Sequence, residues 1–205
     1  MRAVVLCHGE PPSLATLRRE LAAADLVVCT DGAARWLEEQ GFSADFVVGD
    51  MDSLGEEAVA AQPIPAGPHD AQENTDSEKA VRFALDRGAD EITLLGAVGG
   101  RLDHTLGNVL LCAAYEGRAQ LRLVDELGTL EVVRGRRELQ VEPGVRVSLV
   151  ALSEGVRVVT EGLRWELAGT LEPGTRGLSN VAMRDRVVFE VTGGPLAVFT
   201  LHGTD

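Results

Sequence analysis

The sequence predicts an α/β domain with an open, Rossmann-like parallel sheet, followed by an all-β domain built as an antiparallel β-sandwich. In the first half, short apolar runs alternate with segments of helical periodicity, the pattern of strands joined by crossover helices. From about residue 119 the apolar runs are β-rich and are separated by glycine and proline turns, with no helical period between them. We therefore expect two domains, at 1–118 and 119–205.

The elements of the first domain follow from this alternation in order. Apolar runs predict strands at 3–7, 26–30, 46–48 and 91–95. Helical periodicity between them predicts helices at 13–24, 33–40, 56–61, 76–87 and 104–116. The proline-rich segment at 63–68 interrupts all regularity and is expected to be a surface loop near the site.

The second domain is expected to contain six or more antiparallel strands. Short β-rich runs separated by turn residues lie at 121–124, 130–133, 145–150, 156–160, 187–191 and 196–201.

Composition limits the class of protein. The chain has 205 residues and a net charge of -13, from 19 basic and 32 acidic side chains. A basic track for a phosphate backbone is therefore not expected, which argues against nucleic-acid and anionic-membrane binding. The apolar stretch at the N-terminus is too short for a signal peptide or a membrane span, so we expect a cytoplasmic protein. Cys7, Cys29 and Cys112 have the spacing of neither a disulfide framework nor a zinc site and are expected to be buried thiols.

Carboxylates follow the apolar runs of the first half, and ligands of parallel sheets collect at the carboxyl ends of strands. Asp50 and Asp52 lie two residues apart just after one run, so both side chains can point to one side. Converging carboxylates repel one another unless a cation lies among them, which makes Mg²⁺ with a polyphosphate the first hypothesis. The alternative is a turn, because Gly-Asp-x-Asp-Ser is also good turn chemistry.

Asp31 and Gly32 lie between a predicted strand and a predicted helix. Glycine allows close approach of a ligand to the backbone, and the free N–H groups of a helix start can receive an anion. Asp31 as a simple helix N-cap is the alternative.

The segment from Asn74 to Lys79 contains a capping box, in which Thr75 caps the helix and Glu78 reaches back. The box does not require Asp76 or Lys79, which lie three residues apart on one side of the helix. They are either an exposed ion pair or a metal ligand and a phosphate contact.

Gly99 to His104 reads Gly-Gly-Arg-Leu-Asp-His and is the densest polar cluster after a strand. The glycines free the backbone for phosphate approach, and Arg101 offers a two-pronged donor for a phosphoryl group. Asp103 can orient Arg101 or accept a substrate proton. His104 is a nucleotide contact or a cap of the next helix.

Trp165, Ser179 and Asn180 are the notable residues of the second half. Aromatic residues make up only 4% of the chain, so Trp165 is either a core residue or a flat wall for an aromatic, cationic ligand. Ser179 and Asn180 are otherwise expected to form a turn.

Taken in order, these segments resemble thiamine pyrophosphokinase. The family pattern is matched at Asp31-Gly32, from Asp45 to Ser53, from Gln72 to Ala80, and from Gly99 to His104. A Gly-Leu-x-Trp segment ending at Trp165 and a later Ser-Asn extend the resemblance over nearly the whole chain. Ala44 and Glu73 stand where the family commonly has proline and aspartate.

The resemblance implies transfer of the pyrophosphoryl group of ATP to thiamine, which gives thiamine pyrophosphate and AMP. It implies that Asp50, Asp52 and Asp76 bind Mg²⁺, and that the nucleotide is contacted by Asp31, Gly32, Gln72, Gly99 and His104. It further implies that Lys79 and Arg101 contact the phosphates, with Asp103 as an orienting acid. The thiamine pocket would be formed by Trp165, Ser179 and Asn180. It also implies a homodimer whose β domains contact thiamine across the interface.

Two alternatives remain open from the sequence. A hydroxymethylpterin-type pyrophosphokinase could share the acidic motifs and accept a different alcohol. A non-catalytic regulator that binds nucleotide or thiamine is the second, although it has less need of a full set of acidic and basic residues.

Overall fold

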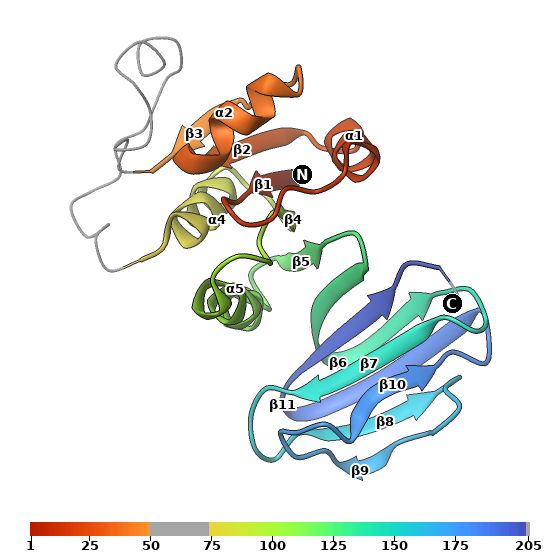
Figure 1. Cartoon of the computed structure of the whole chain (residues 1–205). Coiled ribbons are helices and arrows are strands. Elements are labelled where there is room, and N and C mark those ends of the chain that lie inside the picture. Colours follow the sequence, from red (N-terminus) through yellow and green to blue (C-terminus); the bar gives the residue numbers. More distant parts are fainter. Residues whose placement is uncertain (50–73, 204–205) are drawn as a thin grey trace. The chain divides into compact units, whose positions relative to one another are not determined.

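The computed structural model describes residues 1–49 and 74–203 of the chain (Figure 1). These residues form two compact units. The first contains Met1–Leu111 and Gly117–Glu126, and the second contains Cys112–Glu116 and the chain from Leu127 onward. The helix expected at 56–61 and the proline-rich segment at 63–68 lie outside the described residues.

The first unit alternates strands and helices, as its hydrophobic pattern predicts. In order, its elements are β1 (Arg2–Leu6), α1 (Leu14–Ala22), β2 (Leu26–Thr30), α2 (Asp31–Glu39), β3 (Phe46–Val48), α4 (Asp76–Asp86), β4 (Glu91–Leu95), α5 (Leu102–Tyr115) and β5 (Gln120–Val124). The strands lie in the order β5-β4-β1-β2-β3. All four neighbouring pairs are parallel.

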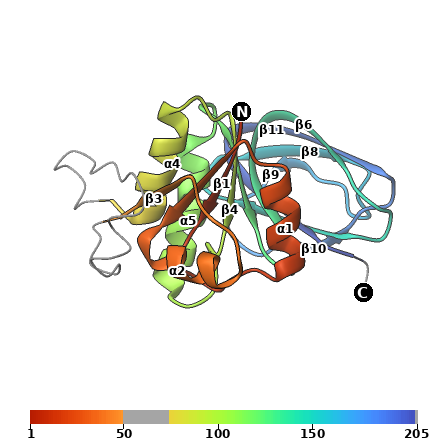
Figure 2. The same cartoon turned by 90° about the horizontal axis from the view of Figure 1, so that it is seen from above.

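Helices cover both faces of this sheet. Val4 of β1 packs with Leu17 of α1 and Leu37 of α2 in one core. Val5, whose side chain points to the opposite face, is also fully buried, and Val81 of α4 is buried as well. Figure 2 shows α1 and α2 on one side of the strands and α4 on the other. Strands buried on both faces explain why their sequences are continuous apolar runs.

One strand differs from the expected arrangement. The run at 121–124, which we expected in the β-rich half, forms β5 and pairs in parallel with β4, with Ile92 opposite Leu121. Its alternating pattern fits an outer strand of a parallel sheet as well as an antiparallel strand. The change from alternating strand and helix patterns to β-rich runs therefore comes before the last strand of the parallel sheet.

The second unit is built of antiparallel strands. They are β6 (Gly128–Gln140), β7 (Arg146–Ala151), β8 (Arg157–Glu161), β9 (Ala168–Thr170), β10 (Gly177–Val181) and β11 (Arg186–Leu201). β11 pairs with β6 on both sides of a register shift. The first part of β11 also pairs with β8, and its second part pairs with β7. β11 therefore connects the β8–β9 pair to the β7–β10 pair.

The runs at 187–191 and 196–201 were expected as separate strands, and this expectation is wrong. They form the single strand β11, whose register shifts between Val191 and Leu196. Gly193, with φ of 81°, lies at this shift. The Gly-Gly-Pro sequence suggests a turn, but here it is an irregularity that interrupts one long strand.

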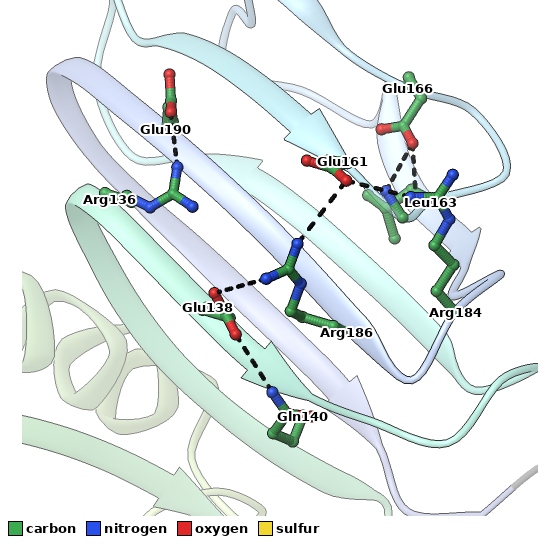
Figure 3. Close-up of polar contacts among 10 residues, drawn as sticks. Arg136, Glu138, Gln140, Glu161, Leu163, Glu166, Arg184, Arg186 and Glu190 are labelled. Carbon is green, nitrogen blue, oxygen red and sulfur yellow. Dashed lines mark hydrogen bonds and ion pairs between the residues drawn. The ribbon is translucent and has the colours of Figure 1, made fainter.

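The two faces of the long strands differ in chemistry. Phe189 and Leu196 of β11 are fully buried in a core with residues of β6, β7 and β8. Figure 3 shows an array of charged side chains on these strands. Arg136 contacts Glu190 at 3.0 Å, and Arg186 contacts Glu138 at 3.6 Å. Exposed pairs of this kind add little stability, but they keep the surface polar.

No helix in the described parts of the chain is both long enough and apolar enough to span a membrane.

Candidate active site

The loops that follow β1 and β4 define the carboxyl edge of the parallel sheet. β1 is the central strand and β4 is its neighbour, but the chain leaves β1 towards β2 and leaves β4 towards β5. Ligands bind at such a reversal of strand order. The pairing of the two strands continues into the loops, where the Gly9 N–H donates to the Gly96 carbonyl at 2.7 Å. The Glu10 N–H likewise donates to the Val98 carbonyl at 2.8 Å.

Two glycines allow these loops to approach so closely. A Cβ at Gly9 would collide with the carbonyl oxygens of Gly96 and Val98. Gly99 has a φ of 78°, and a Cβ there would lie 2.5 Å from the Cβ of Glu10. Gly99, a predicted nucleotide contact, therefore has a steric role in this edge as well.

Asp31 directly follows β2, and its side chain lies next to the end of β3. The alternative interpretation of Asp31 as the N-cap of its helix is wrong, because α2 begins at Asp31 and Thr30 is the N-cap. Asp31 is buried, and one of its carboxylate oxygens accepts from the Gly32 N–H at 2.6 Å. A Cβ at Gly49 would lie 2.8 Å from the other oxygen. The carboxylate thus lies against the residue that precedes Asp50.

His8 and Glu10 belong to this edge and were not identified from the sequence. A Cβ at Gly32 would collide with the imidazole of His8, so the ring lies directly against the start of α2. Glu10 lies against Gly99. A signal was present, because the polar Cys-His-Gly-Glu segment directly follows the first apolar run. It matches none of the motifs that carried the resemblance.

The first turn of α4 also lies at this edge. Thr75 caps the helix, and its hydroxyl accepts from the Glu78 N–H at 3.3 Å, which confirms the predicted cap. The side chain of Ser77 in this turn lies close to the buried thiol of Cys7, the residue that follows β1. The start of α4, and with it Asp76, therefore lies next to the end of the central strand.

Asp76 and Lys79 form an ion pair. The Lys79 ammonium lies 2.7 Å from a carboxylate oxygen of Asp76. The side chains are 19% exposed for Lys79 and 32% exposed for Asp76. The pair is thus partly shielded from water, which strengthens its electrostatics over those of a fully exposed pair.

Arg101 and Asp103 form a two-pronged contact. Nε of Arg101 lies 3.1 Å from one carboxylate oxygen of Asp103, and a terminal nitrogen lies 2.6 Å from the other. Hydrogen bonding to the Arg101 guanidinium lowers the pKa of Asp103 to about 2. The two-pronged contact fits the orienting role, one of the two roles expected for Asp103 from the sequence.

α5 fixes the position of this contact. The helix begins at Leu102, so His104 lies inside its first turn, where its N–H donates to Asp103 at 3.0 Å. The buried Asn108 donates from its side-chain amide to the Ala97 carbonyl at 2.7 Å. Asn108 therefore ties the loop that carries Gly99 to the body of the helix.

Three predicted residues, Asp50, Asp52 and Gln72, lie outside the described residues. Two of the three predicted Mg²⁺ ligands are among them. Within residues 1–49 and 74–203, no three side chains of His, Cys, Asp or Glu gather closely enough to hold a metal ion. Only Asp76 of the predicted ligand set is described, at the start of α4.

In the second unit, Trp165 is 57% exposed. The core interpretation of this residue is therefore wrong. Its indole lies with its ring centroid 5.6 Å from the guanidinium carbon of Arg164. The expected turn at Ser179 and Asn180 is also wrong, because both residues lie in β10. Asn180 is buried, whereas Ser179 is exposed.

Comparison with known proteins gives a consistent family. A model described as thiamin pyrophosphokinase, catalytic domain, matches residues 17–123, and one described as thiamin pyrophosphokinase, vitamin B1 binding domain, matches residues 136–196. The thiamine pyrophosphokinase of Bacillus subtilis (strain 168) is 28% identical over 225 residues, which cover 100% of both chains. Thiamine pyrophosphokinase 1 of Oryza sativa subsp. japonica is 28% identical over 200 residues, which cover 82% of this chain and 74% of the rice protein.

A solved structure has the same fold. The thiamin pyrophosphokinase from Geobacillus thermodenitrificans is 27% identical, with a TM-score of 0.81 over 100% of this chain and 99% of that chain. Its likeness extends over the mixed parallel and antiparallel strands and the few helices described above. Because the catalytic-domain model alone matches residues 17–123, more than half of the 205 residues, the chain belongs to the thiamin pyrophosphokinase family of transferases.

Proposed function

We propose that this enzyme transfers the intact pyrophosphoryl group of ATP to the hydroxyethyl oxygen of thiamine. The new bond joins that oxygen to the β-phosphorus, the bond between the α- and β-phosphates breaks, and AMP leaves. The hydroxyl proton is released in the step. The observation that carries the proposal is the placement of Asp31, Asp76 and the Gly99 loop at the carboxyl edge of one parallel sheet, in a member of this family.

Lys79 and Arg101 are proposed to contact the phosphates. Each is already held by a carboxylate, Lys79 by Asp76 and Arg101 by Asp103. A side chain that is fixed before the substrate arrives loses less conformational entropy on binding it. Such preorganised cations stabilise the charge of a transferring phosphoryl group. Gly32, Gln72, Gly99 and His104 complete the proposed nucleotide contacts.

Mg²⁺ fits the chemistry of the predicted donor set. Asp50, Asp52 and Asp76 offer only carboxylate oxygens, the ligands that this hard cation prefers. Asp31 adds a carboxylate against Gly49, immediately before Asp50 in the chain. When bound, the ion would neutralise negative charge on the phosphates. The role of the chain's own acids is to hold the ion, and Asp31 lies against Gly49, the residue before Asp50 in the chain.

Thiamine is proposed to bind at the second unit, against the exposed indole of Trp165 and near Ser179 and Asn180. Thiamine carries a cationic aromatic ring, and an indole face attracts such a ring. We further propose a cytoplasmic homodimer, in which residues 119–205 supply thiamine contacts across the interface and residues 1–118 bind nucleotide and metal. We also propose the Rossmann-like and β-sandwich classes for the two domains, since helices cover both faces of the parallel sheet and the remaining strands are antiparallel.

Product analysis with competing alcohols tests this function. The enzyme is incubated with ATP, Mg²⁺ and either thiamine or 6-hydroxymethylpterin, and the products are separated by chromatography. We expect equal amounts of AMP and thiamine pyrophosphate and no pterin product. Pyrophosphorylation of the pterin in place of thiamine would reassign the substrate. Binding of thiamine without any turnover would favour a regulator.

A further inference from the structure

The exposed indole of Trp165 is carried by a segment whose backbone is fixed. The segment from Gly162 to Glu166 lies between β8 and β9 and belongs to neither strand. Even so, the Arg164 N–H donates to the Val181 carbonyl at 2.8 Å, and the Met183 N–H donates to the Gly162 carbonyl at 2.8 Å. The segment is therefore bonded to β10 and the residues that follow it.

Asn180 holds the backbone of Trp165 on both sides. The Trp165 N–H donates to Oδ1 of Asn180 at 3.1 Å, and Nδ2 of Asn180 donates to the Trp165 carbonyl at 2.7 Å. Oδ1 also accepts from the Val181 N–H at 2.9 Å. Asn180 is only 4% exposed. Its amide is thus engaged on both ends by the protein and is shielded from a ligand.

An irregularity in β10 aims this side chain inward. The register with β7 shifts between Gly177 and Asn180. Within the shift, Ser179 has a φ of 57°, a left-handed conformation that is uncommon for a residue other than glycine. Ser148 holds it there, since its hydroxyl accepts from the Ser179 N–H at 3.0 Å. Such bulges re-aim a side chain, and here Asn180 is directed to Trp165.

Glu166 fixes the start of the same segment. One of its carboxylate oxygens accepts from the N–H groups of Gly162 and Leu163, at 2.7 and 3.0 Å (Figure 3). The other accepts from the hydroxyl of Thr160 at 2.5 Å. Both ends of the segment are therefore held by side chains, while the indole itself projects into solvent.

We infer that Asn180 is a positioning residue that acts on the substrate through Trp165, by fixing the indole where thiamine stacks against it. The inference rests on the proposed place of thiamine at Trp165. Only a side chain with both a donor and an acceptor can satisfy the N–H and the carbonyl of Trp165 at once. An exposed aromatic ring on a preorganised backbone binds its ligand at a smaller entropic cost. Asn180 thus contributes to thiamine affinity without touching thiamine.

A double-mutant cycle tests this coupling. Asn180→Ala, Trp165→Leu and the double variant are compared with the wild-type enzyme for the KM of thiamine, the KM of ATP and kcat. Loss of the stacking contact corresponds to roughly a threefold to thirtyfold rise in the KM of thiamine. We expect each single variant to show such a rise with the KM of ATP unchanged. In the double variant the KM of thiamine should rise no further than in Trp165→Leu alone, because the effects of two residues that act through the same contact are not additive.

Two controls separate coupling from loss of structure. Glu131→Gln weakens another partly buried polar contact of the same unit, the 2.8 Å pair with Arg137, and should lower the melting temperature without changing the KM of thiamine. Asn180→Asp keeps the size and the acceptor but loses the donor, so it serves if Asn180→Ala does not fold. In a Trp36→Phe background, the fluorescence anisotropy of Trp165 should fall in both Asn180 variants.

Each other outcome overturns the inference in a distinguishable way. Multiplicative effects in the double variant would mean that Asn180 contacts thiamine directly. A lower melting temperature with an unchanged KM of thiamine in the Asn180 variants would make its role purely structural. A normal KM of thiamine in Trp165→Leu, with AMP still produced, would remove Trp165 from the site but leave the proposed reaction standing. Absence of thiamine turnover in the wild-type enzyme would instead contradict the proposed function itself.

Discussion

At the scale of single residues, the site is set by side chains that hold one another. Lys79 and Arg101, the two cations of the described site, are each paired with a carboxylate three or two residues away. The pairing of Asp76 with Lys79 follows from helical spacing, and the contact of Asp103 with Arg101 was one of two roles that the sequence left open. His8 and Glu10 reach Gly32 and Gly99 only through the pairing of strands distant in sequence. The polar segment after the first apolar run indicates where His8 and Glu10 lie in the chain, but a single sequence does not indicate which residues they contact.

The pairing with Arg101 makes a prediction about acidity. The pKa of Asp103 is lowered to about 2 from 3.8. A lowered folded-state pKa means that the contact is formed at any pH above the unfolded value and is lost as pH falls through about 2. Carbon-13 NMR titration of the carboxyl group should therefore show no Asp103 transition between pH 4 and 9. An Asp103 midpoint near 4 that is unchanged in Arg101→Gln would contradict the pairing.

Asn108 provides a second prediction at this scale. Asn108→Ala leaves the buried carbonyl of Ala97 without its 2.7 Å donor, and an unsatisfied buried group costs about 1–3 kcal/mol. Urea unfolding should show a loss of this size. Because the loop with Gly99 is loosened, kcat should fall as well, while the KM of thiamine stays normal. Unchanged stability would mean that Asn108 is not the anchor of this loop.

At the scale of elements, the capping residues and the hydrophobic periods determine the helices and the inner strands. The strands at 26–30, 46–48 and 91–95 begin and end as predicted. β9 and β10 could not be predicted, because they are short and carry few apolar residues. The left-handed conformation of Ser179, which aims Asn180, also has no sequence signal, because serine does not favour it.

Some glycines at the ends of strands are in close contact with neighbouring residues. Replacing such a glycine with alanine, which adds one methyl group, tests how tight the contact is. In Gly49→Ala the new Cβ would lie 2.5 Å from the carboxyl carbon of Asp31, so the carboxylate must move. A displacement of about 1 Å at a reacting site can cost roughly a hundredfold in rate. We expect kcat, measured at saturating ATP, thiamine and Mg²⁺, to fall by a factor that approaches roughly one hundred.

Gly107→Ala is the matched control for this change. Gly107 lies inside α5, and nothing lies within 4 Å of a Cβ placed there. Alanine in place of glycine within a helix stabilises it by up to about 1 kcal/mol. The melting temperature should therefore rise slightly with kcat unchanged. Equal kinetic losses in both variants would show that Gly49 has no special relation to Asp31.

At the scale of the whole molecule, the division into a parallel α/β part and an antiparallel β part was predicted from the change in hydrophobic texture. The position of β5 was not, because a short alternating run fits an outer strand of either kind of sheet. The parts of the candidate site at Asp50, Asp52 and Gln72 stay predictions, since they lie outside the described residues. What the sequence predicts best is therefore the order of motifs, and what it predicts least well is their contacts.

The three buried cysteines report on opening of the folded protein. Cys7, Cys29 and Cys112 are all buried, and burial raises the pKa of Cys7 to about 11 and that of Cys29 to about 12. Thiols with raised pKa values stay protonated and unreactive near neutral pH. A colourimetric disulfide reagent should therefore modify none of them at pH 8 in the native enzyme and all three in urea. Rapid modification of Cys7 or Cys29 without denaturant would contradict the packing of β1 against β2.

The most direct test of the account is the fate of the β-phosphorus of ATP. The enzyme is supplied with thiamine, Mg²⁺ and ATP that carries a radioactive label only at the β-position. If the pyrophosphoryl group moves intact, the label appears in thiamine pyrophosphate and the nucleotide product is unlabelled AMP. If only the γ-phosphoryl group moves, the label stays with the nucleotide as ADP, and that result would contradict the account.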